Sequence, residues 1–407
     1  MLARILTIVG LQGFAVLTAM LHEHLGVHTD EAKYLLNIPY PHPPLMRWIM
    51  GLSDGWQYQE LFWRVIFASC LVHGVWLVAD MARKRSREER LTLCGLWFFT
   101  GALLLQAGTL MMATITAVEV LFLCWMLSRP EILRKWSVLI AALWLEMLFV
   151  AYQGILFAPL VWLALQKSDL SSGKRFAAFV APIILLLLYT LTNPLAVAAL
   201  GLVGGMGRGV AIEEQVIHVL RLWLIGGSGV LSVLGILGIV RSRNWWMLLT
   251  FFLLSVYCML SYREYYAILF APLFIAGASL PHQRISSPTF HLALQMVIGL
   301  ALFFYIPFPA LSNARAIGNA LEREGITVGP VLMKGSYGHE WQYMLPDPIF
   351  PYDEKILNAA VAVICTPWDA CTEEDHRLMD DLGYILHPGY GDEVWIRIEN
   401  LKLKMEN

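Results

Sequence analysis

Long runs of apolar residues, separated by short charged or Pro/Gly-containing breaks, cover most of residues 1–310. A run of about 20 apolar residues predicts a helix that spans a bilayer. The run from 136 to 166 exceeds one span at about 1.5 Å per residue, so we divide it at Tyr152-Gln153-Gly154. The pattern predicts about eleven spans, at 5–21, 60–80, 91–107, 109–127, 136–150, 151–166, 176–192, 222–240, 245–260, 265–280 and 289–307.

The pattern changes near residue 311. A helix in NARAIGNALEREG and a strand in TVGPVLMK are followed by a strand in AAVAVICT, a helix in TEEDHRLMDDLG and strands in YILHP and EVWIRIEN. This alternation predicts a small α/β domain outside the membrane. We therefore predict an α-helical polytopic membrane domain at 1–310, with its first outer loop at 22–59, and a soluble domain at 311–407.

Composition agrees with a membrane protein, because 58% of the residues are hydrophobic and only 15% are charged, against about a quarter in soluble domains. The formal net charge of -2 gives no sign of a nucleic-acid partner. Lys and Arg gather in alternate loops, ARKRSREER, SRPEILRK, QKSDLSSGKR and RSRN. The positive-inside rule then puts these loops and the N-terminus in the cytoplasm. The first outer loop and the tail lie on the extracytoplasmic face, and we expect a bacterial inner membrane.

Two of the six cysteines, Cys365 and Cys371, belong to the tail. In an oxidising compartment they could close a short loop through a disulfide. Their spacing alone leaves the paired and the unpaired state open.

The first outer loop combines acidic, basic and proline residues directly after a span. Asp30 and Glu31 begin a short predicted helix, DEAKYLL, with Thr29 or Asp30 as its cap and Tyr34 one turn further. Prolines at 39, 41, 43 and 44 end that helix. Asp30 therefore has two interpretations, a helix cap in a solvated loop or a reactive carboxylate.

A resemblance favours the second interpretation. The acidic pair, Tyr34 and then His42-Pro43-Pro44-Leu45 are similar to the first outer loop of the glycosyltransferase C superfamily. The likeness is greatest to the branch of protein O-mannosyltransferases and bacterial aminoarabinose transferases. FWRVIFASC and YREYYAILFAPLF also resemble parts of that family. Two family features are missing: the acidic residue at the outer end of the fourth span, where Glu119 lies deeper, and a Lys before the sixth span.

The resemblance implies inverting transfer of a sugar from a polyprenyl-phosphate donor to a hydroxyl of a lipid-linked, glycan or protein acceptor. Asp30 is the first candidate for the base that accepts the acceptor's proton, and Glu31 is the second. One carboxylate suffices, because a phosphate leaves without being protonated. No cofactor is required, although a divalent cation could be held by Asp30, Glu31 and His42. The candidate donor-phosphate ligands are Arg263, Lys33 and Arg64, with Arg47 as a further rival, and the candidate substrate-binding residues are Tyr34, His42 and Tyr265.

Three further features carry weaker hypotheses. Glu119 and Glu146 lie in predicted spans, where a charge is costly, so each should face the bundle interior or the interface. The histidines at 22, 24 and 28 have helical spacing but are more often simply polar than a metal site. GGMGRGVAIEEQVIHVLRLW suggests a Gly-rich hinge before an amphipathic interfacial helix.

Two other classes of function remain as alternatives. An O-antigen ligase or polymerase type of enzyme would be expected to use a large late outer loop, and the late loops before the tail are short. A lipid or glycan transporter without chemistry would need polar residues along a path through both halves of the membrane.

Overall fold

The computed structural model describes residues 2–39, 41–197, 211–280, 285–306, 329–334, 342–343, 349–365, 370–387 and 393–397. The chain divides into two compact units. The helical unit comprises Met1–Met20, Pro39–Leu52 and Gln57–Pro309. The C-terminal unit comprises Leu21–Ile38, Ser53–Trp56 and Ala310–Asn407, so it includes part of the predicted first outer loop.

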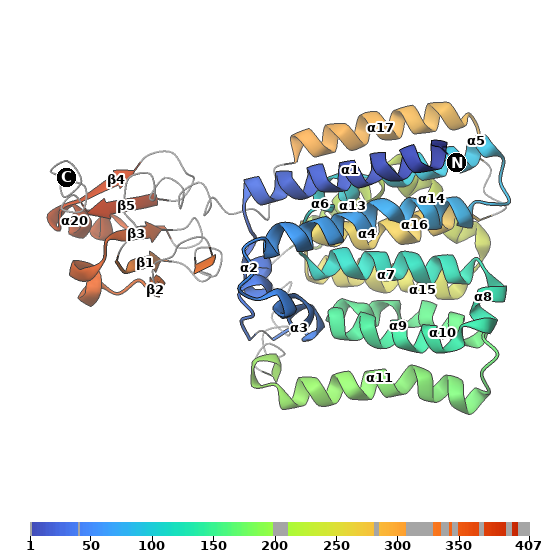
Figure 1. The fold of residues 1–407 in the computed structure, drawn as a ribbon, viewed down its shortest axis with the longest axis horizontal. Coiled ribbons are helices and arrows are strands. Elements are labelled where there is room, and N and C mark those ends of the chain that lie inside the picture. Colours follow the sequence, from blue (N-terminus) through green and yellow to red (C-terminus); the bar gives the residue numbers. More distant parts are fainter. Residues whose placement is uncertain are drawn as a thin grey trace. The chain divides into compact units, whose positions relative to one another are not determined.

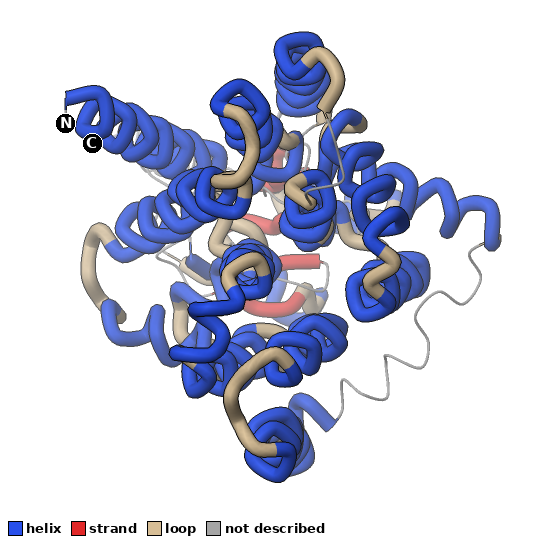
Figure 2. The backbone as a smooth tube through the Cα atoms, turned by 90° about the vertical axis from the view of Figure 1, so that its right-hand side faces the viewer, coloured by secondary structure: helices blue, strands red, loops and turns tan. Residues whose placement is uncertain are grey.

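Helices of the helical unit run side by side in Figure 1 and are seen end-on in Figure 2. Three short 3-10 helices, η1 (Gly51–Ser53), η2 (Tyr152–Phe157) and η3 (Glu264–Leu269), interrupt them. The α-helices are α1 (Leu2–Leu25), α3 (Leu45–Met50), α4 (Gln59–Met81), α5 (Arg87–Phe98), α6 (Gly101–Gln106), α7 (Met112–Leu127), α8 (Pro130–Lys135), α9 (Ser137–Val150), α10 (Ala158–Gln166), α11 (Ser172–Thr192), α13 (Ile212–Gly227), α14 (Val230–Ser242), α15 (Trp245–Leu260), α16 (Ala271–Ala278) and α17 (Pro288–Tyr305).

Helices occupy every predicted span, but most are shorter than predicted. Within the described residues, four are long and apolar enough to cross a membrane by themselves: Arg4–His24, Gln59–Met81, Ser172–Thr192 and Pro288–Tyr305. A bent pair, α13 and α14, adds a fifth if it counts as one span. The helical membrane architecture is thus supported, whereas the count of eleven spans is not confirmed. The division of the long run is confirmed, since α9 ends at Val150 and η2 begins at Tyr152.

The predicted span at 222–240 is wrong as a single helix. Instead α13 and α14 meet at an angle of 103°. Ser228 and Gly229 lie between them with φ angles of 46° and 73°, a left-handed conformation that glycine adopts readily. The Ser228 hydroxyl accepts a hydrogen bond from the backbone N–H of Gly101 at 2.6 Å, which fixes the bend against α6.

Glycines allow α14 and α16 to pack closely. A Cβ atom added to Gly238 would lie 2.0 Å from the carbonyl oxygen of Gly277, and one added to Gly277 would lie 2.3 Å from that of Gly235. Such small-residue contacts are typical of helix pairs in membranes. The pair packs into the core of the helical unit, together with fully buried Phe270 and Phe274.

The C-terminal unit contains a five-stranded sheet of order β2-β1-β3-β5-β4. Strand β1 is parallel to β2 and β3, and β5 is antiparallel to β3 and β4. Four predicted strands and the predicted helix α20 are confirmed, while β2 was not predicted. The predicted helix in NARAIGNALEREG lies outside the described residues. The elements are α2 (Thr29–Leu35), β1 (Val331–Lys334), β2 (Ile349–Pro351), η4 (Glu354–Ala359), β3 (Ala362–Cys365), α20 (Glu373–Asp381), β4 (Tyr384–His387) and β5 (Glu393–Arg397).

A disulfide joins Cys365, the last residue of β3, to Cys371, just before α20. Their Cα atoms are 5.4 Å apart, within the range of ordinary disulfides. The structure therefore selects the paired state that the sequence left open. The four free cysteines, Cys70, Cys94, Cys124 and Cys258, belong to α4, α5, α7 and α15.

Candidate active site

Helix α2 carries the acidic pair, and its N-terminus is capped by His28. The Nδ1 atom of His28 accepts a hydrogen bond from the backbone N–H of Asp30 at 3.2 Å. In return, the Glu31 carboxylate accepts one from the backbone N–H of His28 at 2.8 Å. This reciprocal pair is a capping box. The prediction that Thr29 or Asp30 would be the cap is therefore wrong, because His28 supplies the acceptor.

Asp30 and Lys33 lie on one face of α2. The Nζ atom of Lys33 is 3.5 Å from Oδ1 of Asp30. The side chain of Lys33 is only 8% exposed and that of Asp30 only 14%. A spacing of three residues places such side chains one turn apart. The result is a shielded carboxylate next to an ammonium group. Tyr34, which follows Lys33, is 1% exposed, and Glu31 is completely buried.

The C-terminal end of α2 explains the direction of the following chain. Asn37 adopts a φ of 52°, a left-handed conformation that asparagine tolerates better than most residues. The proline-rich stretch begins two residues later at Pro39. Proline lacks an N–H group, so this stretch cannot continue the helix.

Two tyrosines of the helical unit hold the proline-rich stretch. The Tyr152 hydroxyl donates to the carbonyl of Pro41 at 2.9 Å, and the Tyr189 hydroxyl donates to that of His42 at 3.5 Å. Thr190 on α11 donates to the Tyr152 oxygen at 3.4 Å. The His42 ring, half-buried, lies 6.0 Å from the Tyr152 ring between centroids. His42 is therefore held through its backbone by η2 and α11.

Arg64 is completely buried near the beginning of α4. Its Nε atom donates to the Glu60 carboxylate at 2.8 Å, and Nη1 donates to the carbonyl of Gly108 at 2.8 Å. These contacts tie α4 to the chain just after α6. Arg64 therefore has hydrogen-bond partners within the helical unit, and its role in phosphate binding stays a prediction.

Arg263 is exposed on the turn between α15 and η3. Its Nη1 atom donates to the carbonyl of Tyr262 at 3.1 Å, and no described carboxylate forms an ion pair with it. The Tyr262 hydroxyl donates to the Glu264 carboxylate at 3.2 Å, and Glu264 also forms an ion pair with Arg221 of α13. Burial and the Glu264 charge raise the pKa of Tyr262 to about 12, so its hydroxyl keeps its proton. Arg263 is thus a cation on an ordered turn.

Tyr265 packs edge-on against Tyr266 of the same turn, with ring centroids 4.7 Å apart. The Tyr266 hydroxyl accepts a hydrogen bond from Nε2 of Gln153 at 2.9 Å and lies 3.0 Å from the Tyr257 hydroxyl. Gln153 also donates to Tyr257 at 2.9 Å. This network joins η2, α15 and η3. Sequence reasoning missed it, although Gln153 stood out as a polar residue within a long apolar run.

The predicted site residues form two groups. Asp30, Glu31, Lys33 and Tyr34 share α2 in the C-terminal unit, and the structure brings Asp30 and Lys33 together. The remaining predicted residues belong to the helical unit, where Arg263 and Tyr265 share one turn. These residues are His42, Arg47, Arg64, Arg263 and Tyr265.

Among the described residues, the carboxylate, imidazole and thiol groups close enough to hold a metal together are those of Cys365, Cys371 and Glu393. The two sulfur atoms there are already joined in the disulfide. The cation that Asp30, Glu31 and His42 could hold stays a prediction, and Glu31 already serves the capping box.

Comparison with known proteins gives little further guidance. No family model matches the sequence, and no curated protein does. Among solved structures, the chain is similar to arabinofuranosyltransferase AftD from mycobacteria, with 12% identity and a TM-score of 0.40. The match covers 96% of this chain but 41% of AftD, so the chain spans about two fifths of that protein's length. A likeness of this strength does not define a family.

Proposed function

We propose that this chain is a membrane glycosyltransferase that moves a sugar from a polyprenyl-phosphate-linked donor to an acceptor hydroxyl on the extracytoplasmic face. The first outer loop supports the proposal through its resemblance to the glycosyltransferase C superfamily. The observation that carries it is that the two carboxylates of α2 have different contacts. His28 and Glu31 form the cap, and Asp30 next to them pairs with Lys33 at 3.5 Å.

In this reaction the Asp30 carboxylate accepts the proton of the acceptor hydroxyl. The hydroxyl oxygen then attacks the anomeric carbon from the face opposite to the phosphate, and the bond from that carbon to the phosphate oxygen breaks. The lipid phosphate leaves with the electron pair, and the configuration at the anomeric carbon is inverted. A positioned general base contributes about 10²–10⁴-fold to such a step.

The departing phosphate gains negative charge, so the proposal also needs a cation. Arg263 is our first choice, because it is exposed and forms no ion pair with a described residue. Lys33 is the second choice, since it already lies beside Asp30. Arg64 is less suitable, because Glu60 and the Gly108 carbonyl engage its guanidinium. We place Tyr34, His42 and Tyr265 at the sugar or acceptor.

The extracytoplasmic location of the C-terminal unit is also part of the proposal. Its disulfide between Cys365 and Cys371 is typical of oxidising compartments. The basic loops after α4, α7, α10 and α14 favour a cytoplasmic location for the helix ends that they follow.

The test is the variant Asp30→Asn, which keeps the size of the side chain but removes the base. Transfer of labelled sugar from a polyprenyl-phosphate donor is followed in native membranes. Asp54→Asn serves as the matched control, because Asp54 is an exposed acid in the same predicted loop. We expect Asp30→Asn to slow transfer by about 10²–10⁴-fold and Asp54→Asn to leave it unchanged. Equal insertion and thermal stability of both variants would exclude misfolding as the cause.

Undiminished transfer by Asp30→Asn would remove the catalytic role from Asp30. Absence of transfer from every polyprenyl-phosphate sugar, with the wild-type chain intact in the membrane, would contradict the proposed function itself. Transfer that continues after chelation with EDTA would agree with a reaction that needs no divalent cation.

A further inference from the structure

A cavity of about 270 Å³ lies at one end of the helical unit. Its lining comes from segments far apart in the sequence, around the C-terminal ends of α4, α7, α10 and α16 and the beginning of α15. All four basic loops identified in the sequence reach this end of the unit. Arg64 and Arg263 lie at the other ends of α4 and α15, so the cavity is separate from the candidate active site.

The rim of the cavity is cationic. Lys84 and Lys167 line it, are exposed, and form no ion pair with any described residue. Arg85 also lines it, with a side chain that is 8% exposed. The Arg85 guanidinium donates to the carbonyl oxygens of Ala278 and Leu280, which fixes it at the wall of the cavity, and its Nη1 atom pairs with the Glu89 carboxylate at 3.3 Å. The cations of the rim without a described acid partner are therefore Lys84 and Lys167.

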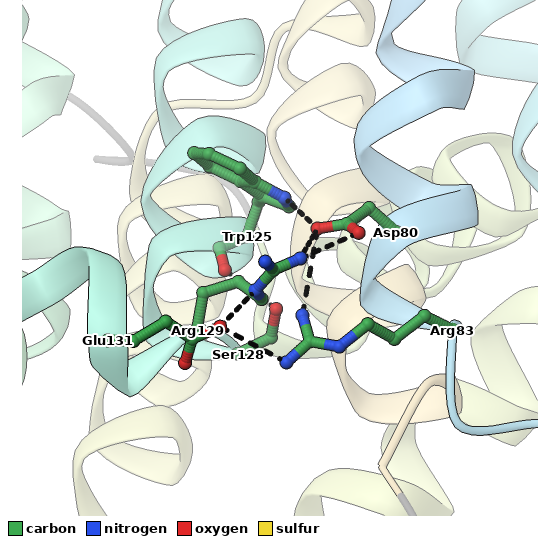
Figure 3. A network of polar contacts seen from close by, with 6 residues as sticks. All are labelled: Asp80, Arg83, Trp125, Ser128, Arg129 and Glu131. Carbon is green, nitrogen blue, oxygen red and sulfur yellow. Dashed lines mark hydrogen bonds and ion pairs between the residues drawn. The ribbon is translucent and has the colours of Figure 1, made fainter.

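A neighbouring network keeps the fourth cation, Arg83, in place. Figure 3 shows Arg83 and Arg129 converging on the Asp80 and Glu131 carboxylates. Arg129 donates to Asp80 at 2.7 Å, and the Trp125 indole donates to the same carboxylate at 2.7 Å. The two acids of this network are thereby engaged, and neither belongs to the cavity lining.

Ser279 provides a hydrogen-bonding group without a partner. Ser279 lines the cavity just after α16, and its Oγ atom is buried and makes no hydrogen bond with any described residue. Leaving a buried hydroxyl unsatisfied costs about 1–3 kcal/mol. A buried hydroxyl of this kind calls for a partner such as an ordered water or a ligand group.

Apart from Ser128 and Asn244, the rest of the wall is apolar and is formed by leucine, methionine, alanine and cysteine side chains of the packed helices. A ligand that fits has a negatively charged head for Lys84, Lys167 and Ser279 and an apolar part for this wall. We propose that the cavity binds an anionic phospholipid, with its phosphate among these residues and the start of an acyl chain against the helices. Lipid headgroup pockets of this kind lie between helices on the cytoplasmic side of membrane proteins.

The test uses the full-length chain purified in an uncharged detergent. Thermal unfolding is measured during titration with short-chain phosphatidylglycerol, with phosphatidylcholine of the same chain length, and with inorganic phosphate. The variant is Lys84→Gln with Lys167→Gln. Its matched control is Lys135→Gln with Lys174→Gln, which removes the same charge from the same set of basic loops but leaves the cavity lining intact.

We expect phosphatidylglycerol to raise the unfolding temperature of the wild type and of the control, and phosphatidylcholine and phosphate to have no such effect. The lysine variant should need about tenfold more phosphatidylglycerol, because it loses charge-assisted contacts. Ser279→Ala should also weaken the lipid effect, while the lipid-free variant is as stable as the wild type or more so. That combination separates binding from a structural role of the hydroxyl.

Equal responses of the lysine variant and its control would overturn the site. Stabilisation by inorganic phosphate alone, lost in the lysine variant, would overturn the lipid and assign the cavity to a soluble phosphate. The measurement is made without a sugar donor, so it tests lipid binding independently of the proposed transferase reaction.

Discussion

Three carboxyl groups of this chain lie in very different surroundings. Asp30 pairs with Lys33 on α2. Asp375 accepts hydrogen bonds from Lys334 and from the Thr372 hydroxyl. Glu119 on α7 is 5% exposed, and neither of its carboxylate oxygens has a hydrogen-bond partner among the described residues. Glu119 therefore faces the bundle interior, as predicted. It has no described charge partner, so its surroundings give no sign of a second reactive acid.

Asp375 makes the stability of the C-terminal unit depend on pH. Burial alone would raise its pKa, but Lys334 and Thr372 outweigh burial and hold the pKa of Asp375 below its usual range. The unfolded chain binds the proton at a higher pH, near about 3.9. The contribution of Asp375 is therefore complete above that value and is lost as the pH falls through the lower, folded-state pKa.

We expect Asp375→Asn to destabilise the C-terminal unit by about 1.5–3 kcal/mol at pH 7. The measurement is the urea dependence of hydrogen exchange in peptides from β3 and α20, at pH 7 and at about pH 2.5, which lies below the unfolded-state pKa. The deficit of the variant should be smaller at the acidic pH than at pH 7. Asp380→Asn, on the same helix, is the control, and a deficit equal at both pH values would contradict the assignment.

At the scale of elements, the contact between α14 and α16 gives a prediction with a clear sign. Gly238→Ala would place a Cβ atom 2.0 Å from the Gly277 carbonyl oxygen, a backbone atom that cannot rotate away. The two helices must separate, so we expect the unfolding temperature to fall by several degrees. Thermal unfolding of the purified chain measures the change.

Gly13→Ala is the matched control for that experiment. Gly13 lies within α1, and an added Cβ there meets nothing within 4 Å. Since alanine favours a helix over glycine by about 1 kcal/mol, this variant should be as stable as the wild type or slightly more. If both variants lowered the unfolding temperature equally, close packing at Gly238 would not be the reason.

Helix positions could be predicted from the sequence, because burial in a membrane or a core demands long apolar runs whatever the neighbours are. Features decided by distant contacts could not. The bend at Ser228 depends on Gly101, more than a hundred positions away, and a hydropathy pattern does not register a left-handed φ. The hydrogen bond from Arg64 to the Gly108 carbonyl likewise leaves no trace in the sequence, and phosphate binding by Arg64 stays a prediction.

For α2, the sequence predicted the helix correctly but not its capping residue. The acidic start of the helix was visible, but the cap was assigned to Thr29 or Asp30 because histidine is not among the preferred capping residues. The choice depends on an imidazole nitrogen reaching the N–H of Asp30, which is a matter of local geometry. Strand β2 was missed because three residues are too few to show alternation.

For the whole molecule, the test concerns sidedness. Cysteine is introduced at Asp54, in the predicted outer loop, or at Lys174, in a basic loop; both positions are exposed. A membrane-impermeant maleimide should label Asp54→Cys in cells with an intact inner membrane and Lys174→Cys only after lysis. The parent chain, whose four free cysteines lie in helices, gives the background. The reverse result would place Asp30 in the cytoplasm and contradict the proposed reaction.

The helices of the helical unit differ in length, which affects how deep in the membrane their ends lie. Helices α7 and α15, with 16 residues each, are about 24 Å long, whereas a bilayer's hydrocarbon layer is about 30 Å thick. Only 11% of the apolar window in each of α11 and α17 is buried, so these long helices form the lipid-facing perimeter. If α7 and α15 are membrane spans as predicted, at least one end of each lies within that layer. At such a depth the proposed isoprenoid-linked donor would keep its chain in the lipid.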